Sequence, residues 1–171
     1  ENGFHFNNNN MLILESKVLV ENYNTEFNEL WNNVTSGGEQ TKHSAISDPT
    51  TGLGIQNYFC PEDSCQEKTI AELKKAKKSI YAMAFSFTDE AIADTLLMSA
   101  ADVQVIMEKR NVNGLGSQFW RLKQFGISIQ NDTNPRTMHH KVFIIDNETV
   151  ITGSYNPTRS GNTRNDENVL I

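Results

Sequence analysis

The sequence predicts an α/β sandwich, in which helices pack on a largely parallel or mixed β-sheet. From about residue 55 onward, short apolar stretches typical of strands alternate with amphipathic stretches typical of helices. One strand-like stretch, Ser79–Phe87, carries apolar residues on both faces, which indicates a strand covered on both sides. With 171 residues, of which 37% are hydrophobic and 21% charged, the chain is long enough for one well-packed domain.

The elements of this domain are expected to follow one another with short connections. Strands are expected at residues 55–59, 79–87, 102–107, 127–130, 141–145 and 149–152. Helices are expected at residues 66–77, 88–98 and 117–125. Thr88 is the predicted N-cap of the second of these helices, and Gly126 closes the third.

A further helix is predicted near the N-terminal end of the chain, where the Ser16 hydroxyl is suited to capping its first turn. Its apolar residues recur at helical spacing on one face: Leu19, Tyr23, Phe27, Leu30 and Trp31. Such a face needs a sheet to cover it. Residues 34–53, in contrast, are rich in Gly, Ser, Thr and Asp-Pro and show no periodicity, so they are expected to form a linker.

The polar residues with the clearest pattern surround a predicted hairpin, whose two strands are joined by a turn at Asp146–Glu148. The hairpin brings the polar clusters that precede and follow it beside each other. Because successive side chains of a strand alternate, His139 and Lys141 point to the same face and His140 points to the other. An imidazole and an ammonium group within reach of one ligand indicate a phosphate site.

The spacing is His139-x-Lys141-x4-Asp146-x6-Gly153-Ser154-x-Asn156, and Glu167 follows eleven residues later. This pattern resembles the HKD motif of the phospholipase D superfamily, and the run from His139 to Asn168 resembles its phosphodiesterase and endonuclease branch. The resemblance covers residues 54–171. It implies a phospholipase D-like α-β-α sandwich with a mixed central sheet, and a phosphodiester hydrolase that requires no cofactor.

The residue types of the motif suit phosphodiester hydrolysis, which needs a nucleophile, a charge for the non-bridging oxygens and a proton for the leaving alkoxide. A neutral His139 imidazole can attack phosphorus and form a phosphohistidine. Lys141 supplies positive charge, and Ser154 and Asn156 can donate hydrogen bonds to phosphoryl oxygens. Glu167 can accept the other imidazole N–H and thereby fix its tautomer.

The remaining residues of the motif have less direct roles. Asp146 stands a full strand length from His139, so we expect it to anchor the hairpin or a partner lobe, although it belongs to the family's catalytic pattern. His140 is expected to be structural. The motif contains no cluster of metal ligands, and Lys141 supplies the charge that a metal would supply, so hydrolysis is expected to be metal-independent.

The distribution of charge favours a polyanionic substrate. The chain carries a formal charge of −6, but residues 109–164 hold eight basic and three acidic side chains, a net charge of +5, which leaves −11 elsewhere. Arg136, Arg159 and Arg164 flank the motif and are candidates for binding neighbouring phosphates, although each is equally compatible with a solvated surface charge.

DNA or RNA is favoured as the substrate because no amphipathic basic helix suited to a membrane surface is present. Two alternatives stay open. One is a phospholipase D-type lipid hydrolase. The other is a non-catalytic module for nucleic-acid binding or assembly.

The two cysteines, Cys60 and Cys65, lie close together in the sequence, without a second pair of Cys or His residues that would complete a zinc site. A local disulfide and two free thiols are both compatible with this spacing. No run approaches the about 18 apolar residues of a membrane span, so none is expected, and the compartment, cytoplasmic or exported, stays open. Because the chain begins at Glu1, we expect its true N-terminus to lie elsewhere.

An internal repeat links the two ends of the chain. Residues 3–13 align with residues 161–171 at a constant offset of 158. We therefore expect residues 1–33 to be the C-terminal strand and helix of a preceding HKD repeat, and residues 54–171 to be an HKD domain that lacks its last helix. Chance similarity between two Asn-rich segments is the alternative. The alignment places Asn9 opposite Glu167.

The family resemblance implies that two HKD motifs supply the nucleophile and the general acid across a pseudo-twofold axis. This chain contains one such motif. The second is expected from a homodimer partner or from the preceding repeat, and the chain alone is expected to be inactive as a monomer. Because Asn9 stands where Glu167 would be, the preceding repeat would lack the orienting carboxylate. His139 is therefore the expected nucleophile, and the histidine of the other lobe the acid.

Overall fold

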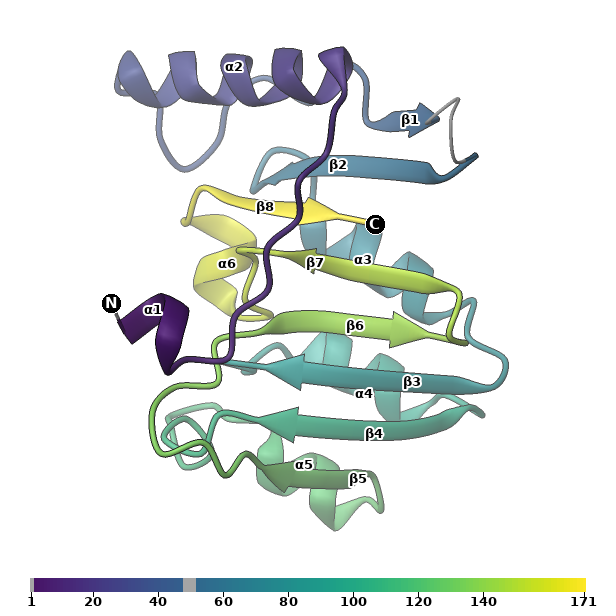
Figure 1. The fold of residues 1–171 in the computed structure, drawn as a ribbon. Coiled ribbons are helices and arrows are strands. Elements are labelled where there is room, and N and C mark those ends of the chain that lie inside the picture. Colours follow the sequence, from purple (N-terminus) through teal and green to yellow (C-terminus); the bar gives the residue numbers. More distant parts are fainter. Residues whose placement is uncertain (1, 48–51) are drawn as a thin grey trace.

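The computed structural model describes residues 2–47 and 52–171. Within these residues, a sheet of eight strands forms the centre of the fold, in the order β1-β2-β8-β7-β6-β3-β4-β5 (Figure 1). The strands are β1 (Ala45–Ser47), β2 (Gly54–Cys60), β3 (Ser79–Ala84), β4 (Asp102–Met107), β5 (Ser128–Asn131), β6 (Lys141–Ile145), β7 (Thr149–Gly153) and β8 (Glu167–Leu170). The pairs β3–β4 and β4–β5 are parallel, and the other neighbouring pairs are antiparallel. The predicted α/β fold with a mixed sheet is therefore confirmed.

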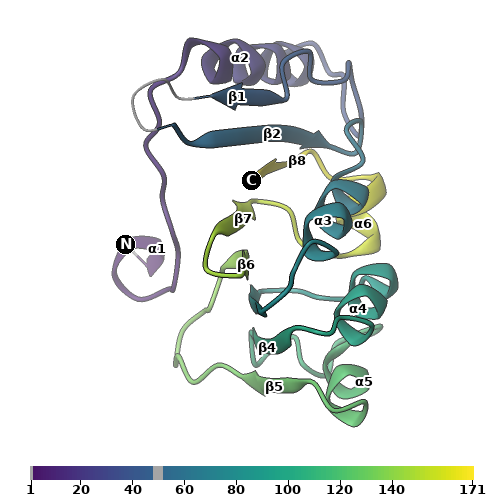
Figure 2. The same cartoon turned by 90° about the vertical axis from the view of Figure 1, so that its right-hand side faces the viewer.

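The helices are α1 (Asn2–His5), α2 (Lys17–Trp31), α3 (Cys65–Leu73), α4 (Glu90–Leu97), α5 (Phe119–Gln124) and α6 (Arg159–Thr163). Figure 2 shows α3, α4, α5 and α6 on one face of the sheet, whereas α2 lies beside the edge strand β1. The opposite face is crossed by the chain between α1 and α2 (Figure 1). Among the described residues, no helix combines the length and the apolar character needed to cross a membrane.

The hydrophobic core lies between the sheet and the layer of four helices. Its largest aliphatic side chains are completely buried, and they include Ile80, Ile92, Leu96, Met107 and Leu122. Burial of each such side chain contributes roughly 1.5–3 kcal/mol relative to exposure. This layer therefore holds the strands that carry the polar motif at their ends.

The ends of the helices agree with the expected ones to within a few residues, but one predicted cap is wrong. Ser16 caps α2 as expected, since its hydroxyl oxygen accepts a hydrogen bond from the Leu19 amide at 3.3 Å. The N-cap of α4, in contrast, is Asp89 and not Thr88. The Asp89 carboxylate accepts a hydrogen bond from the Ile92 amide at 2.9 Å, and a carboxylate satisfies the positive end of a helix better than a hydroxyl does.

The apolar face of α2 is covered only at its beginning. Leu19 is buried, and the ring of Tyr23 packs edge-on against Phe59 with 4.9 Å between centroids. The next turns extend past the edge of the sheet, which leaves Phe27 and Trp31 exposed at 59% and 75%. The expectation that a sheet covers this whole face is therefore wrong within this chain.

Part of the expected linker is ordered. Ala45–Ser47 forms β1 and pairs with β2, and the Thr41 backbone amide donates to the Asp63 carboxylate at 3.0 Å. Earlier in the segment, the Ser36 amide donates to Asp166 at 2.7 Å. These bonds run from backbone groups to side chains, and hydrophobic periodicity does not reveal them. Residues 48–51 of the linker lie outside the described residues.

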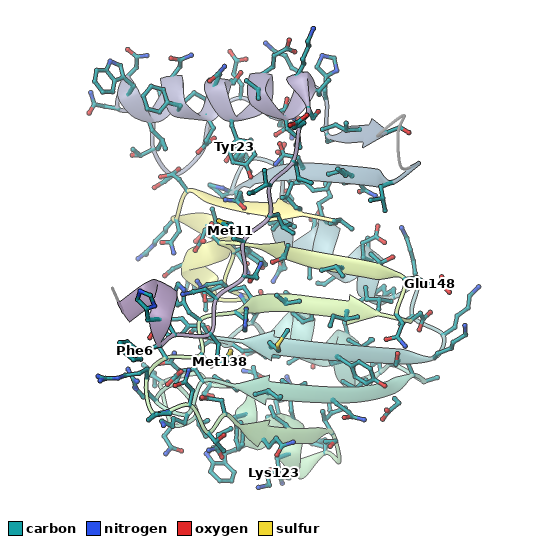
Figure 3. All side chains as sticks on the ribbon, viewed as in Figure 1. Phe6, Met11, Tyr23, Lys123, Met138 and Glu148 are labelled. Carbon is teal, nitrogen blue, oxygen red and sulfur yellow. A yellow bond between two sulfur atoms is a disulfide. The ribbon has the colours of Figure 1, made fainter. Side chains whose placement is uncertain are left out.

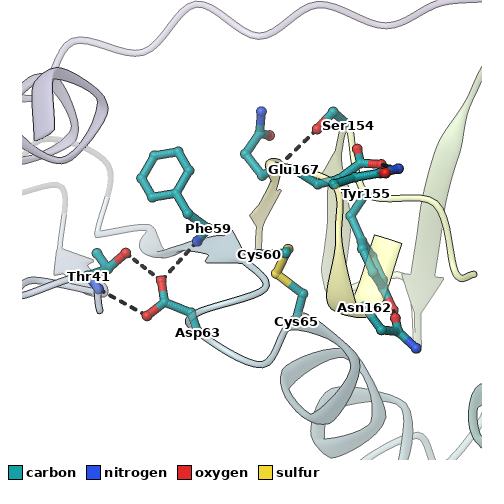
Figure 4. Close-up of a disulfide and its surroundings, with 11 residues drawn as sticks. Thr41, Phe59, Cys60, Asp63, Cys65, Ser154, Tyr155, Asn162 and Glu167 are labelled. Carbon is teal, nitrogen blue, oxygen red and sulfur yellow. Dashed lines mark hydrogen bonds between the residues drawn. A yellow bond between two sulfur atoms is a disulfide. The ribbon is translucent and has the colours of Figure 1, made fainter. Parts of the chain in front are cut away.

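The structure contains a disulfide between Cys60 and Cys65, which resolves the two possibilities left open by the spacing (Figure 4). The bond joins the last residue of β2 to the first residue of α3. Within the closed loop, the Asp63 carboxylate accepts a hydrogen bond from the Phe59 amide at 2.9 Å. The β2–α3 connection is thus fixed both covalently and by hydrogen bonding.

Asp146 anchors the β6–β7 hairpin, as expected from its position. Asp146 and Asn147 both adopt left-handed conformations, with φ of 56° and 58°, which suits a tight two-residue turn. The Asp146 carboxylate accepts hydrogen bonds from the amides of Lys77, Lys78 and Ser79 at 2.9, 2.7 and 2.9 Å. These three bonds hold the pKa of Asp146 below its usual value. They fix the turn to the beginning of β3.

We predict that Asp146→Asn lowers the melting temperature at neutral pH, because a neutral amide is a weaker acceptor for three amides. The wild-type stabilisation is present above the unfolded-state pKa of about 3.9 and is lost as pH falls through the lower folded-state pKa. The difference between the two proteins should therefore shrink at acidic pH. Thermal unfolding by circular dichroism over a pH series measures it, with Asp102→Asn as the matched exposed control. Equal melting temperatures at neutral pH would contradict the anchoring role.

Candidate active site

The polar motif is assembled by three antiparallel strands whose ends meet at one edge of the sheet. β6 begins where β7 ends, and β8 begins beside the same end of β7. Gly153 allows β7 and β8 to lie close together at this point, because a Cβ atom added to it would overlap the carbonyl oxygen of Asn168. Its φ of 153° also favours glycine. The residues that precede β6, follow β7 and begin β8 are therefore brought together.

One cavity of about 510 Å³ lies at this edge. Five of the predicted site residues line it: His139, Lys141, Ser154, Asn156 and Glu167. Asn9 and Asn10, from the segment that crosses the open face of the sheet, line it as well. The hairpin geometry inferred from the sequence thus places the motif residues around one space, and the N-terminal contribution was not foreseen.

Lys141 is unusually buried for a lysine, with 8% of its surface exposed. Its ammonium group donates to the His139 carbonyl oxygen at 2.8 Å and lies 4.9 Å from the centroid of the Phe85 ring. Burial lowers the pKa of Lys141 to about 8, although the negative charge of Glu167 opposes this shift. The ammonium is therefore a poorly hydrated cation that an anionic ligand would stabilise.

The His139 ring packs edge-on against Phe85, with 4.7 Å between ring centroids. Burial lowers the pKa of His139, and the charges of Lys141 and His140 lower it further, whereas Glu108 and Glu167 oppose the shift. The imidazole is consequently neutral near pH 7, the form in which a ring nitrogen is nucleophilic. Phe85 was predicted only as an apolar strand residue. Its contact with both His139 and Lys141 could not be deduced from strand periodicity.

Ser154 and Asn156 offer hydrogen-bonding groups in the lining of the same cavity. The Ser154 hydroxyl oxygen accepts a bond from the Asn168 amide at 2.9 Å, which leaves its proton free to donate. The Asn156 side-chain nitrogen donates to the Ser154 carbonyl at 3.3 Å, and its oxygen is buried without a partner among the described residues. The same nitrogen carries a second hydrogen that this bond does not use and that can be donated to a ligand. Both residues are suited to binding an anion.

Glu167 lies in the cavity, but the expected hydrogen bond to His139 is not formed. The Glu167 carboxylate is buried and accepts a bond from the Asn165 side chain at 3.1 Å. Its influence on His139 is therefore electrostatic. Burial raises the pKa of the neighbouring Tyr155 hydroxyl, and the charges of Asp89 and Glu167 act in the same direction. Figure 4 shows Tyr155 reaching away from this edge to Asn162, to which its hydroxyl donates.

The other predicted residues lie outside the cavity. His140 faces away from it, as expected, and its Nδ1 is 3.0 Å from Asn10 Oδ1. Asp146 is at the far end of β6, as the labels of Met138 and Glu148 at opposite ends of the sheet in Figure 3 indicate. Asp146 therefore does not line the cavity, and its carboxylate bonds the amides at the beginning of β3 instead. Three exposed arginines, Arg136, Arg159 and Arg164, do not line the cavity. Arg159 is the first residue of α6, and Arg164 is the C-cap of this helix.

Glu108 is a further residue of this region that sequence reasoning missed. It is completely buried at the end of β4, and its carboxylate accepts a hydrogen bond from the Met138 amide at 2.6 Å. An acidic residue directly after an apolar strand is the signal that could have revealed it. By accepting the amide of the residue before His139, Glu108 positions the loop that carries His139 and also places a negative charge near the imidazole.

A polar cavity with a histidine, a buried lysine and neutral hydrogen-bond donors, at the strand ends of a mixed α/β sheet, is typical of phosphodiester-cleaving proteins of the HKD type. A sequence model of the family described as "Cardiolipin synthase, PLD-like domain" matches residues 69–171. The chain therefore belongs to the phospholipase D superfamily of phosphodiester hydrolases, as its motif predicted.

Individual relatives agree with this family. A phospholipase D of Rickettsia typhi is 33% identical over 135 residues, which cover 77% of this chain and 66% of that protein. A mitochondrial cardiolipin hydrolase of Xenopus laevis is 31% identical over 123 residues, 68% of this chain and 59% of its own length. The solved structure of Nuc, a phospholipase D family member from Salmonella typhimurium, matches with a TM-score of 0.64 and 34% identity. This match covers 68% of the chain and 80% of Nuc, and the chain thus spans roughly three-fifths to four-fifths of these relatives.

We predict that Lys141 titrates near pH 8, because its charged form is poorly hydrated in the cavity. Glu167→Gln should lower this pKa further, since the carboxylate stabilises the ammonium. NMR of ¹³C-labelled lysine side chains measures both values, and the signal is assigned by its absence in Lys141→Arg. A Lys141 pKa unchanged or raised by Glu167→Gln would contradict the described electrostatics.

Proposed function

We propose that this chain carries the nucleophilic half-site of a metal-independent phosphodiesterase that acts through a phosphohistidine. The observation that supports it most directly is the presence of His139, Lys141, Ser154, Asn156 and Glu167 around one cavity. A decayed, non-catalytic module would not be expected to keep all five chemical groups. The enzyme is therefore favoured over the binding or assembly module.

In the proposed reaction, a ring nitrogen of His139 attacks phosphorus while the bond to the leaving oxygen breaks. The Lys141 ammonium neutralises charge on the non-bridging oxygens, and Ser154 and Asn156 donate hydrogen bonds to them. The leaving alkoxide takes its proton from a general acid. Water then attacks the phosphohistidine, which releases the phosphoryl product and restores His139. Glu167 stabilises the imidazolium that forms during attack through its nearby negative charge.

The charge that many phosphodiesterases obtain from a metal is supplied here by Lys141. Within residues 2–47 and 52–171, the acidic groups close enough to share an ion are Glu26, Glu29 and Glu62, whose ligand atoms lie within 4.8 Å of one another. They belong to α2 and the β2–α3 connection, and none of them lines the motif cavity. Hydrolysis through His139 uses no ligand from this cluster.

We predict that His139→Asn reduces hydrolysis of bis(p-nitrophenyl) phosphate by at least about 10³-fold, since the substituted side chain has no nucleophilic ring nitrogen. His140→Asn is the matched control, because His140 faces the other side of the strand and should retain most activity. Assays in EDTA should give the same rates as assays without it. Activity of His139→Asn within tenfold of wild type, or metal-dependent recovery after EDTA, would refute the mechanism.

Nucleic acid is the proposed substrate. Three basic residues lie in the two segments next to His139: Lys109, Arg110 and Arg136. Hydrogen bonds from Lys109 to Asn134, from Arg110 to Arg136 and from Met138 to Glu108 join these segments. A repeating phosphate backbone can contact several of these positive charges together. The polar lining of the cavity suits a phosphodiester without restricting the groups on either side of it.

A phospholipid is the second candidate, and a specific feature favours it. A groove of about 810 Å³ runs over the open face of the sheet, with apolar side chains such as Val142, Val150 and Leu170 along it. It shares Asn10, Leu12, Thr152 and Leu170 with the polar cavity. An acyl chain could follow this groove from a phosphate bound at His139. Comparing cleavage of an oligonucleotide with cleavage of phosphatidylcholine and cardiolipin vesicles decides between the two substrates.

The general acid is proposed to come from a second HKD lobe. The two aligned segments, residues 3–13 and 161–171, have similar local structures, which supports a repeat. In the first segment α1 is followed by an extended stretch, and in the second α6 is followed by β8. Asn9 and its aligned counterpart Glu167 line the same cavity. Equivalent residues of two lobes related by a twofold axis would meet in this way at a shared site. Residues 1–33 are therefore proposed to be the end of a preceding lobe, with residues 54–171 as the second.

We predict that turnover of an oligonucleotide, whose alkoxide leaving group needs protonation, depends on assembly of two lobes. Activity per chain should rise with protein concentration in parallel with the dimer fraction, or appear when the chain is joined to a preceding lobe. Analytical ultracentrifugation under assay conditions supplies the dimer fraction. Full activity in a species shown to be monomeric would exclude the shared site.

A further inference from the structure

An aromatic ring among cationic side chains lies on the surface beside the catalytic cavity. Phe6 is 52% exposed, and the guanidinium carbon of Arg136 lies 5.4 Å from the centroid of its ring. Arg110 donates through its guanidinium to the Arg136 carbonyl oxygen, and 55% of its side chain is exposed. The cluster therefore presents two positive charges and part of an aromatic ring to solvent.

The carboxylates near this cluster are buried beneath it. Glu108 is completely buried, and its Oε1 lies 3.4 Å from Arg110 Nε. Its other oxygen accepts the Met138 amide. Asp132, also buried, accepts the Lys109 amide at 2.9 Å. The exposed surface is positive, because the negative charges are buried and the guanidinium groups are exposed. Glu108 contacts both Arg110 and the Met138 amide, and it therefore fixes the position of Arg110 relative to the residue before His139.

The N-terminal segment joins this cluster directly to the catalytic loop. The Asn8 amide donates to the Thr137 carbonyl at 2.9 Å, and the His139 amide donates to the Asn8 carbonyl at 2.9 Å. Asn134 donates to the Phe6 carbonyl at 3.0 Å. Phe6 precedes Asn8 by two residues, which span at most about 7 Å, so Phe6 lies close to the residue that bonds the His139 amide. Figure 3 shows Phe6 and Met138 at the same edge of the sheet.

We propose that Phe6, Arg110 and Arg136 form a subsite for single-stranded nucleic acid, next to the phosphate bound at His139. A base stacks on Phe6, and the adjoining backbone phosphates contact the two guanidinium groups. This inference rests on the proposed cleavage of nucleic acid and adds the strand preference. Bases of a single strand have free planar faces that stack on aromatic side chains, whereas bases inside a duplex are already stacked on each other. A phospholipid offers a phosphate but no planar ring for Phe6.

The test compares Phe6→Ala with Phe6→Trp and with the matched control Phe27→Ala, which alters another exposed phenylalanine, on α2. Each substitution is made in the His139→Asn protein, so that binding of a fluorescent oligodeoxynucleotide is measured by anisotropy without cleavage. Phe6→Ala should weaken binding of the single strand by about tenfold, the loss expected from one stacked base. Phe6→Trp should bind at least as tightly as the parent, and Phe27→Ala should bind unchanged. Duplex of the same sequence should respond to Phe6→Ala by less than twofold.

An effect of Phe6→Ala below twofold on the single strand would overturn the proposal. So would an equal loss for duplex, or for vesicles of cardiolipin, since neither offers free base faces. A parallel measurement follows hydrolysis of bis(p-nitrophenyl) phosphate by the chain with His139 intact, which Phe27→Ala should leave unchanged. Failure of the wild-type chain to hydrolyse that compound would count against the hydrolase alone, because the anisotropy experiment requires no turnover.

Discussion

The close approach of β7 and β8 at Gly153 is the constraint on which the candidate site depends. No side chain fits between Gly153 and the Asn168 carbonyl, so any other residue would push the two strands apart. The Ser154 amide and hydroxyl both bond the Asn168 backbone directly after this contact. Ser154, Asn156 and Glu167 are thereby held around one cavity, and the β6–β7 pairing adds His139 and Lys141.

Within this frame, partial burial sets the chemistry of the two basic groups. Lys141 and His139 both pack against Phe85, which removes water from one side of each. Both pKa values fall as a result, and the positive charge of Lys141 lowers the pKa of His139 further. The arrangement keeps the imidazole neutral while the neighbouring ammonium still carries charge below about pH 8. A phosphodiester bound here would relieve the poor hydration of Lys141, which is a reason for the site to bind anions.

The sequence was most informative where the pattern is local. The bounds of β4 and β6, the alternation of His139 and His140, and the turn at Asp146 could all be inferred from periodicity and spacing. Contacts between residues distant in the sequence could not be inferred in this way. Glu108 reaches the Met138 amide, and Asn10 reaches both His140 and Thr152, across separations that no local pattern encodes. The expected hydrogen bond from His139 to Glu167 is not formed, and the contact that the Glu167 carboxylate does make, with Asn165, was not predicted.

The central claim is that the His139 ring nitrogen becomes covalently bonded to phosphorus. With bis(p-nitrophenyl) phosphate, attack expels p-nitrophenolate, which needs no protonation, and leaves a p-nitrophenyl phosphoryl group on the ring. Rapid quenching at alkaline pH followed by tandem mass spectrometry of the peptide containing His139 and His140 tests this directly. The mechanism predicts a modification on His139 that appears within the first turnover and disappears as substrate is exhausted. Product release without any modified histidine, or with the modification on His140, would contradict it.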